Sequence, residues 1–203
     1  MIVGVVNNGM SNVGSVMSAF EFYRHHVELV DRPDCLKTPD LLVLAGVGSF
    51  NMAVKRLKQS GLWDALQEEV LVKRKPILGI CLGMQLFATE GFENGRDDGF
   101  GWIPGTVVKI DDPAVRVPHT GWDEVLPRDP RLFNRVKVNS FYYMHSYHLL
   151  PDDNTVIAAT TPYGSGEIVA AVIKENIVGT QFHPEKSQGD GMRLLQNVLE
   201  IIT

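Results

Sequence analysis

The chain has 203 residues, a formal net charge of −5 and a hydrophobic content of 44%. This length suffices for one large domain with a buried core, and the negative charge argues against nucleic acid or an anionic membrane as partner. No apolar stretch approaches the ~18 residues of a membrane span, and two cysteines, Cys35 and Cys81, suggest no disulfide framework. We therefore expect a single domain over residues 1–203, with no membrane segment.

The first part of the chain alternates apolar strands with amphipathic helices. Strands are predicted over residues 1–6, 27–30, 41–44 and 76–80. Helices are predicted from a cap at Ser11 or Asn12 through Phe22, around residues 52–58, and over residues 62–73. This alternation is typical of an α/β fold with a parallel sheet flanked by helices.

The second part is richer in strands. Short strands are predicted over residues 106–110, 141–147, 155–160, 168–173 and 177–181. A closing helix is predicted over residues 189–201, because Met192, Leu195, Val198 and Leu199 recur at helical spacing. No linker, repeat or low-complexity tract interrupts the chain, which agrees with one domain.

The segment Gly79-Ile-Cys-Leu-Gly-Met-Gln85 places Cys81 between two glycines, where a predicted strand meets a helix. This is the G-x-C-x-G form of the nucleophile elbow, with sulfur in place of a serine oxygen. A thiolate attacks where a thiol does not, and a helix N-terminus and a neighbouring imidazole both favour the thiolate. A thiol nucleophile must stay reduced, which indicates the cytoplasm. The alternative is that Cys81 is a buried structural thiol.

The segment Gln181-Phe-His-Pro-Glu-Lys186 supplies a base and a carboxylate. If it is a strand end, period-two geometry sends His183 and Glu185 to the same face and Pro184 to the other. His183 would take the thiol proton and deliver it to a leaving group, and Glu185 would orient the imidazole. As an alternative, His183 and Glu185 bind a metal together with His119 or His145, although their spacing is not typical of zinc.

Attack on a carbonyl builds an oxyanion, which needs N–H donors already in position. The backbone N–H of Leu82, directly after the elbow, is the first candidate. The second should come from the loop Ala45-Gly-Val-Gly48, because it follows the apolar run at residues 41–44.

These motifs resemble the class I, or triad-type, glutamine amidotransferases, and within them the glutaminase subunits of imidazole glycerol phosphate synthases. The class resemblance rests on the two segments around Cys81 and His183. The subfamily resemblance rests on Gly46-Val-Gly48, Val117-Pro-His-Thr-Gly-Trp122, Phe141-Tyr-Tyr-Met-His-Ser-Tyr147 and Glu185-Lys-Ser187. The landmarks follow the family's order from residue 1 to residue 203. The resemblance implies a flavodoxin-like fold with a central, mostly parallel sheet flanked by helices and an extra strand-rich C-terminal half.

The resemblance also implies the substrate, L-glutamine, and the residues that bind it. Gln85 matches a position that contacts glutamine, and Glu93 matches an acid that receives its α-ammonium group; the alternative for Glu93 is a solvent-facing acid in a loop. Ser146 and Tyr147 match the backbone that holds the α-carboxylate. Val47 and Gly48 match the oxyanion strand, whose donor often appears only after a peptide rotation that glycine neighbours permit.

The resemblance implies that no cofactor and no metal are needed and that a partner protein is. The resemblance implies a heterodimer with a (β/α)8 cyclase subunit, which receives the ammonia. Asn12, Thr120, Trp122 and Asp123 match the face that docks against the cyclase, where an aromatic residue suits a hot-spot anchor. The alternative for Trp122 is a place in the core.

Three departures from the family pattern bear on the partner more than on the triad. The first turn reads Asn7-Asn8 where Asp-Tyr is common, Ala45 replaces a proline, and Asp123 stands where asparagine is common. The leading alternative is therefore a paralogous subunit that feeds ammonia to a synthase amidating surface sugars. A non-catalytic regulatory or binding subunit and a stand-alone thiol hydrolase are the remaining alternatives.

Overall fold

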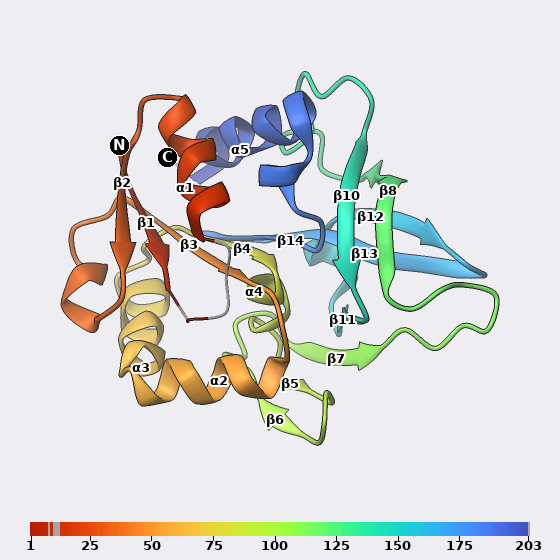
Figure 1. The fold of residues 1–203 in the computed structure, drawn as a ribbon, viewed down its shortest axis with the longest axis horizontal. Coiled ribbons are helices and arrows are strands. Elements are labelled where there is room, and N and C mark those ends of the chain that lie inside the picture. Colours follow the sequence, from red (N-terminus) through yellow and green to blue (C-terminus); the bar gives the residue numbers. More distant parts are fainter. Residues whose placement is uncertain (8, 10–12, 203) are drawn as a thin grey trace.

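An eight-stranded mixed sheet runs through the computed structural model, which describes residues 1–7, 9 and 13–202 (Figure 1). The strand order is β2-β1-β3-β4-β14-β13-β12-β9. The first five strands are parallel: β2 (His26–Val30), β1 (Ile2–Val6), β3 (Leu41–Gly46), β4 (Ile77–Cys81) and β14 (Ile177–Thr180). The last three are antiparallel: β13 (Gly166–Lys174), β12 (Ile157–Tyr163) and β9 (Leu126–Pro127).

Helices cover both faces of the parallel half, as the alternation in the sequence predicts. Figure 1 shows α2 (Phe50–Gln59) and α3 (Leu62–Gln67) on one face, and α1 (Val13–Phe22) and α5 (Gln188–Ile202) on the other. The strands are buried on both faces, so neighbouring side chains enter two different cores. In β3, Leu42 and Leu44 pack toward α2 and α3, whereas Leu41 and Val43 pack toward α1 and α5.

Two smaller sheets build the other end of the molecule. One pairs β8 (His119–Glu124) with β10 (Ser140–His145), and they are antiparallel. The other has the order β11-β7-β5-β6, with β11 (Tyr147–Pro151), β7 (Gly105–Lys109), β5 (Glu90–Gly91) and β6 (Asp97–Asp98). In the described part of the chain, 3-10 turns lie at Pro33–Leu36, Asn154–Val156 and Pro184–Lys186.

Most predicted elements are present, and several boundaries differ. The predicted strand 141–147 is wrong as one element: it breaks at Ser146, where the chain leaves β8 and joins the sheet of β7. The predicted helix 62–73 is present over residues 62–72, as α3 followed directly by a π-helical turn at Glu68–Val72. The strand β8 was not predicted. The predicted cap at Ser11 or Asn12 lies outside the described residues.

Among the residues that the structure describes, no helix combines the length and apolar character needed to cross a bilayer. The longest helix, α5, has 15 residues and keeps a polar face.

Candidate active site

Cys81 lies at the sharp turn where strand β4 passes into the short helix α4 (Leu82–Gln85). Its φ of 54° and ψ of −109° lie in a region that residues with a side chain rarely adopt, at a cost of about 1–3 kcal/mol. Both flanking glycines are needed. A Cβ on Gly79 would lie 2.5 Å from the Phe87 ring, and one on Gly83 would lie 1.7 Å from the Leu44 carbonyl oxygen. Close packing therefore requires the glycine that the sequence motif has on each side of Cys81.

His183 and Glu185 meet as predicted, although the predicted strand geometry is wrong. Strand β14 ends at Thr180, and His183 precedes the 3-10 turn Pro184–Lys186. The turn brings the Glu185 Oε1 to 2.8 Å from the His183 Nδ1, and both side chains are 3% exposed. The carboxylate therefore fixes the tautomer in which Nδ1 carries a hydrogen, so that Nε2 is the nitrogen left for chemistry.

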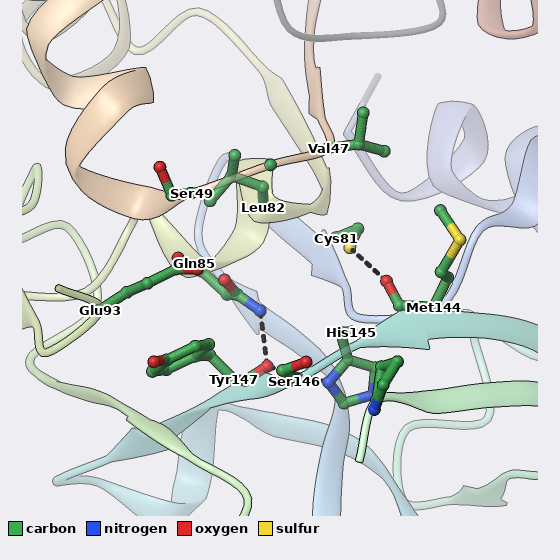
Figure 2. Close-up of a pocket in the computed structure, with 12 residues that line it drawn as sticks. Val47, Ser49, Cys81, Leu82, Gln85, Glu93, Met144, His145, Ser146 and Tyr147 are labelled. Atoms are coloured by element: carbon green, nitrogen blue, oxygen red, sulfur yellow. Dashed lines mark hydrogen bonds between the residues drawn. The ribbon is translucent and has the colours of Figure 1, made fainter.

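The electrostatic surroundings of His183 favour its charged form. Burial alone would lower the pKa of its imidazole, but the nearby Cys81 sulfur and the hydrogen-bonded Glu185 carboxylate outweigh burial and raise that pKa to about 10. The His183 Nε2 has no hydrogen-bond partner of ordinary distance and angle among the described residues, yet the Cys81 sulfur is near enough to raise the imidazole pKa. The Cys81 thiol donates instead to the Met144 carbonyl oxygen, 3.8 Å away (Figure 2).

A cavity of about 330 Å³ opens in front of the thiol (Figure 2). Its walls come from the loop after β3, the start of α4, the loop after β5, and the junction of β10 with β11. The residues of the predicted site that line it are Val47, Gly48, Cys81, Leu82, Gln85, Glu93, Ser146 and Tyr147. The cavity has room for a small amino acid, and its lining mixes backbone N–H groups with one carboxylate.

The two backbone segments of the predicted oxyanion site line the cavity together with Cys81. Leu82 begins α4, and the first N–H groups of a helix have no partner within it. Val47 and Gly48 line the cavity from the loop between β3 and α2, and Gly48 has a φ of 104°. Glycine adopts this backbone region readily, so the peptide before it can rotate at small cost.

Gln181 is a site residue to which the sequence reasoning gave no role. It is fully buried, its Nε2 donates to the Cys81 sulfur at 3.6 Å, and its Oε1 accepts from the Gln85 Nε2 at 3.1 Å. The Gln85 Nε2 also donates to the Tyr147 carbonyl at 2.7 Å (Figure 2). Both hydrogens of that amide are therefore engaged, which leaves the Gln85 oxygen for a ligand. The only signal for this role in the sequence was the glutamine two residues before His183.

Glu93 is not a solvent-facing acid in a loop, and one of its two carboxylate oxygens already has a partner within the protein. Its Oε2 accepts the N–H of Phe50 at the start of α2, at 2.8 Å, while the residue lines the cavity. The favourable position at a helix N-terminus keeps the carboxylate in place. Ser146 and Tyr147 lie across the cavity from Glu93, at the break between β10 and β11 (Figure 2).

Of the predicted docking residues, Thr120 and Trp122 share the exposed face of β8, whereas Asp123 points to the opposite face, where it contacts His119. Trp122 is 44% exposed, which contradicts a place in the core, and the side chain of Asp123 is 43% exposed. Thr120 is exposed on the same strand. Met144, Val117 and Val138 add exposed apolar area nearby. Asn12 lies outside the described residues.

The described residues contain no group of three or more histidine, cysteine or acidic side chains that could hold a metal ion. His183 is paired with Glu185, and His119 and His145 are hydrogen-bonded to each other at 3.0 Å.

Comparison with known proteins agrees with this geometry. The family model described as glutamine amidotransferase class-I matches residues 4–201. The chain is 40% identical to the imidazole glycerol phosphate synthase subunit HisH of Pelagibacter ubique, over 99% of this chain and 100% of that protein. It is 43% identical to a HisH 1 subunit of Campylobacter jejuni, over 97% of this chain and 98% of that protein. It is 42% identical to the HisH subunit of a Geobacillus species, over 99% and 97%.

Solved structures share the fold at lower identity. A glutamine amidotransferase structure matches with a TM-score of 0.79 and 16% identity, covering 100% of this chain and 99% of that one. The structure of PurLQS from Thermotoga maritima matches with a TM-score of 0.76 and 17% identity, over 100% and 99%. The predicted α/β fold with a mostly parallel central sheet and a strand-rich C-terminal half is confirmed.

Proposed function

The chain belongs to the class I glutamine amidotransferases, and on that premise we propose that it is the glutaminase subunit of an imidazole glycerol phosphate synthase in histidine biosynthesis. It hydrolyses glutamine to glutamate and ammonia. The chemistry rests on one observation: Cys81 stands on a strained elbow, and the buried His183–Glu185 pair lies close enough for Cys81 to raise the pKa of His183. The place in this synthase rests on relatives of about 40% identity over nearly the full length.

The reaction follows from these groups. The Cys81 thiolate attacks the side-chain amide carbon of glutamine, and the backbone N–H groups of Leu82 and Val47 stabilise the oxyanion. The His183 imidazolium protonates the departing nitrogen, which leaves as ammonia, and a glutamyl thioester remains. His183 then takes a proton from water, which attacks the thioester and releases glutamate and the thiol. Glu185 keeps the imidazole in the required tautomer.

The amino acid is held by groups around the cavity. The α-carboxylate binds the backbone at Ser146 and Tyr147, and the α-ammonium group binds Glu93. Gln85 contacts the substrate through its amide oxygen. Val47 and Gly48 form the part of the oxyanion site that a peptide rotation completes, so that hydrolysis is fast only after that rotation.

Ammonia in water at neutral pH is mostly protonated and is then no nucleophile, so direct transfer to a second site is needed. We propose a (β/α)8 cyclase as the partner in a heterodimer, docked on the exposed face of β8 that carries Thr120 and Trp122, and we propose Asn12 and Asp123 as further contact residues. Met144 supports this: its carbonyl oxygen accepts from the Cys81 thiol, and its side chain is 38% exposed on that face. Met144 thus contacts the reacting sulfur through its carbonyl oxygen and the proposed docking surface through its side chain.

We further propose that residues 1–203 act as one glutamine amidotransferase domain without cofactor or metal. A cytoplasmic location fits the chemistry, because both cysteines are free and the mechanism needs a reduced Cys81.

Glu185→Gln is expected to lower the kcat of glutamine hydrolysis by about a thousandfold or more, because an amide neither fixes the tautomer nor stabilises the imidazolium. Glu185 raises the pKa of His183, so the variant loses its imidazolium at a lower pH than the parent. The alkaline limb of the pH–rate profile should move to lower pH. Glu175→Gln, at an exposed carboxylate between β13 and β14, is the matched control. Unchanged kcat and pH profile in Glu185→Gln would contradict the triad.

The function is tested by glutamate release from the purified chain alone, with the cyclase of the same organism, and with the cyclase plus its ribonucleotide ligand. We expect glutamate release to be about a hundredfold or more faster in the full mixture than with the chain alone, because one missing oxyanion donor costs about that factor in rate. An unrelated nucleotide with the cyclase is the control.

Other results would select other functions. Stimulation by a sugar-amidating synthase, with none by the cyclase, would favour the paralogue. Full turnover by the chain alone would favour a stand-alone hydrolase. No glutamate release in any mixture, together with failure of a chloroketone analogue of glutamine to label Cys81, would leave only a binding role.

A further inference from the structure

A chain of hydrogen bonds joins the exposed strand β8 to the wall of the cavity. The Asp123 Oδ2 lies 2.6 Å from the His119 Nε2, the His119 Nδ1 lies 3.0 Å from the His145 Nε2, and the His145 Nδ1 lies 2.8 Å from the Tyr147 carbonyl oxygen. Asp123 is 43% exposed, whereas His119 and His145 are 1% and 6% exposed. The chain therefore starts in solvent and ends inside the protein.

Its inner end holds the backbone that borders the cavity. The Tyr147 carbonyl accepts from both His145 and Gln85, and these two bonds fix the junction of β10 with β11. Ser146 lies in this junction and lines the cavity with Tyr147; Figure 2 shows His145 beside them. A change in the orientation of His145 would therefore move the segment that we assign to the α-carboxylate of glutamine.

Counting hydrogens shows what the chain requires. A carbonyl oxygen only accepts, so the His145 Nδ1 carries a hydrogen, and a neutral His145 then needs a hydrogen from His119 at its Nε2. A carboxylate also only accepts, so the His119 Nε2 needs a hydrogen as well. Three contacts need three hydrogens on ring nitrogens, and two neutral imidazoles supply two. The full chain exists only with one more proton, held by His119 or shared between His119 and Asp123.

We propose that Asp123, His119 and His145 are positioning residues for glutamine binding, and that their chain is complete only while it holds this additional proton. The proposal rests on the proposed function, since it concerns the same glutamine site. Without the proton, either two ring lone pairs face each other across 3.0 Å or the contact with Asp123 breaks. The junction at Tyr147 then loses one of its supports, and glutamine binds less tightly.

The surroundings of His119 set the direction of the pH effect. Tyr143 and Tyr163 stack on its ring, with centroids 4.4 and 3.9 Å away, and burial raises the pKa of both phenols, so both stay neutral. Burial lowers the pKa of His119 below its ordinary value, and the Asp123 carboxylate opposes this only in part. The proton is therefore lost before the pH reaches neutrality, and glutamine binding should weaken as the pH rises.

The inner histidine does not take the proton instead. Burial, together with the charges on His119, His148 and His183, lowers the pKa of His145 to about 3, and the bond to the Tyr147 carbonyl opposes this only in part. His145 is thus the neutral member of the chain.

The first measurement is the Kd of glutamine by calorimetry in a Cys81→Ala background, which separates binding from chemistry. We compare pH about 5.5 with pH about 7.5, on either side of the ordinary histidine pKa. Binding should be about fivefold tighter at the lower pH, the effect of one neutral hydrogen bond.

Asp123→Asn is the decisive variant, because an amide can donate to a neutral His119 and complete the chain without the proton. In the same background its Kd should change less than about twofold between the two pH values, and at the higher pH it should bind about fivefold tighter than the parent. Glu124→Gln removes the same charge from the neighbouring exposed position of β8 and should keep the parent's pH dependence. Equal pH dependence in both variants would overturn the proposal.

A readout without glutamine keeps this test separate from the proposed function. The imidazole 15N shifts of His119 should follow the gain of one proton on acidification, and Asp123→Asn should keep both rings neutral over the same range. Two neutral rings in the parent at both pH values would overturn the proposal whatever the binding shows. A titrating His119 with glutamine bound equally at both pH values would overturn the positioning role. A titrating His119 with no glutamine binding at all would mean that the proposed function is wrong.

Discussion

Cys81→Ala is expected to lower glutamate release from glutamine by about ten-thousandfold or more, because removal of the nucleophile of a triad removes nearly all of its catalysis. The cavity, the His183–Glu185 pair and the exposed face around Trp122 do not depend on the thiol. The complex should therefore still make its product when ammonia is supplied instead of glutamine. The measurement is glutamate release and product formation by one preparation of the complex, with each nitrogen source.

The matched control for this prediction is Cys35→Ala, at the other free cysteine, which follows β2 in the 3-10 turn Pro33–Leu36. It should keep both activities. Glutamate release that survives in Cys81→Ala would show that the nucleophile is another residue. Loss of the ammonia-dependent reaction as well would mean that the substitution damages the complex, and Cys81→Ser would then be the variant to compare.

Gly83→Ala is expected to lower the free energy of unfolding by more than about 3 kcal/mol, since overpacking against backbone cannot be relieved by turning a side chain. The added Cβ would lie 1.7 Å from the Leu44 carbonyl oxygen and 2.7 Å from the Leu44 carbonyl carbon. Helix α4 must therefore move away from β3. This shift would also separate Leu82 from the Val47–Gly48 loop, so glutaminase activity should fall with stability.

Denaturant unfolding at constant pH measures this effect. Gly189→Ala is the control, because nothing lies within 4 Å of its added Cβ and the residue is in the first turn of α5. It should be neutral or stabilise the protein by up to about 1 kcal/mol. A free energy of unfolding in Gly83→Ala that equals the parent's would show that α4 does not need its close approach to β3. Failure of this variant to accumulate in folded form, while Gly189→Ala does, agrees with the prediction.

Local patterns in the sequence were enough to predict the parallel half of the fold. The runs at residues 1–6, 41–44 and 76–80 are apolar without interruption, which is the signature of strands covered on both faces. The elbow could be predicted for a similar reason. A backbone as tight as that at Cys81 tolerates no side chain on Gly79 or Gly83, so the constraint appears in the sequence as glycine.

The strand-rich part was predicted less well, because its pairing is non-local. Strand β8 carries Gly121 and polar residues on an exposed face, so its sequence lacks an apolar run. It becomes a strand by pairing with β10, which lies some twenty residues further along the chain. The pairing of His183 with Glu185 was predicted from strand periodicity, whereas a 3-10 turn brings them together.

Short stretches of sequence were sufficient to predict the elbow at Cys81, the pairing of His183 with Glu185, and the layered α/β architecture, since each depends on residues close together in the chain. The remaining contacts of the site arise only when the chain folds. Folding brings Gln181 to the sulfur, the Met144 carbonyl to the thiol, and His119 to His145. These contacts join residues 26 to 100 positions apart, and no local pattern encodes them, because each depends on how elements distant in the sequence pack together.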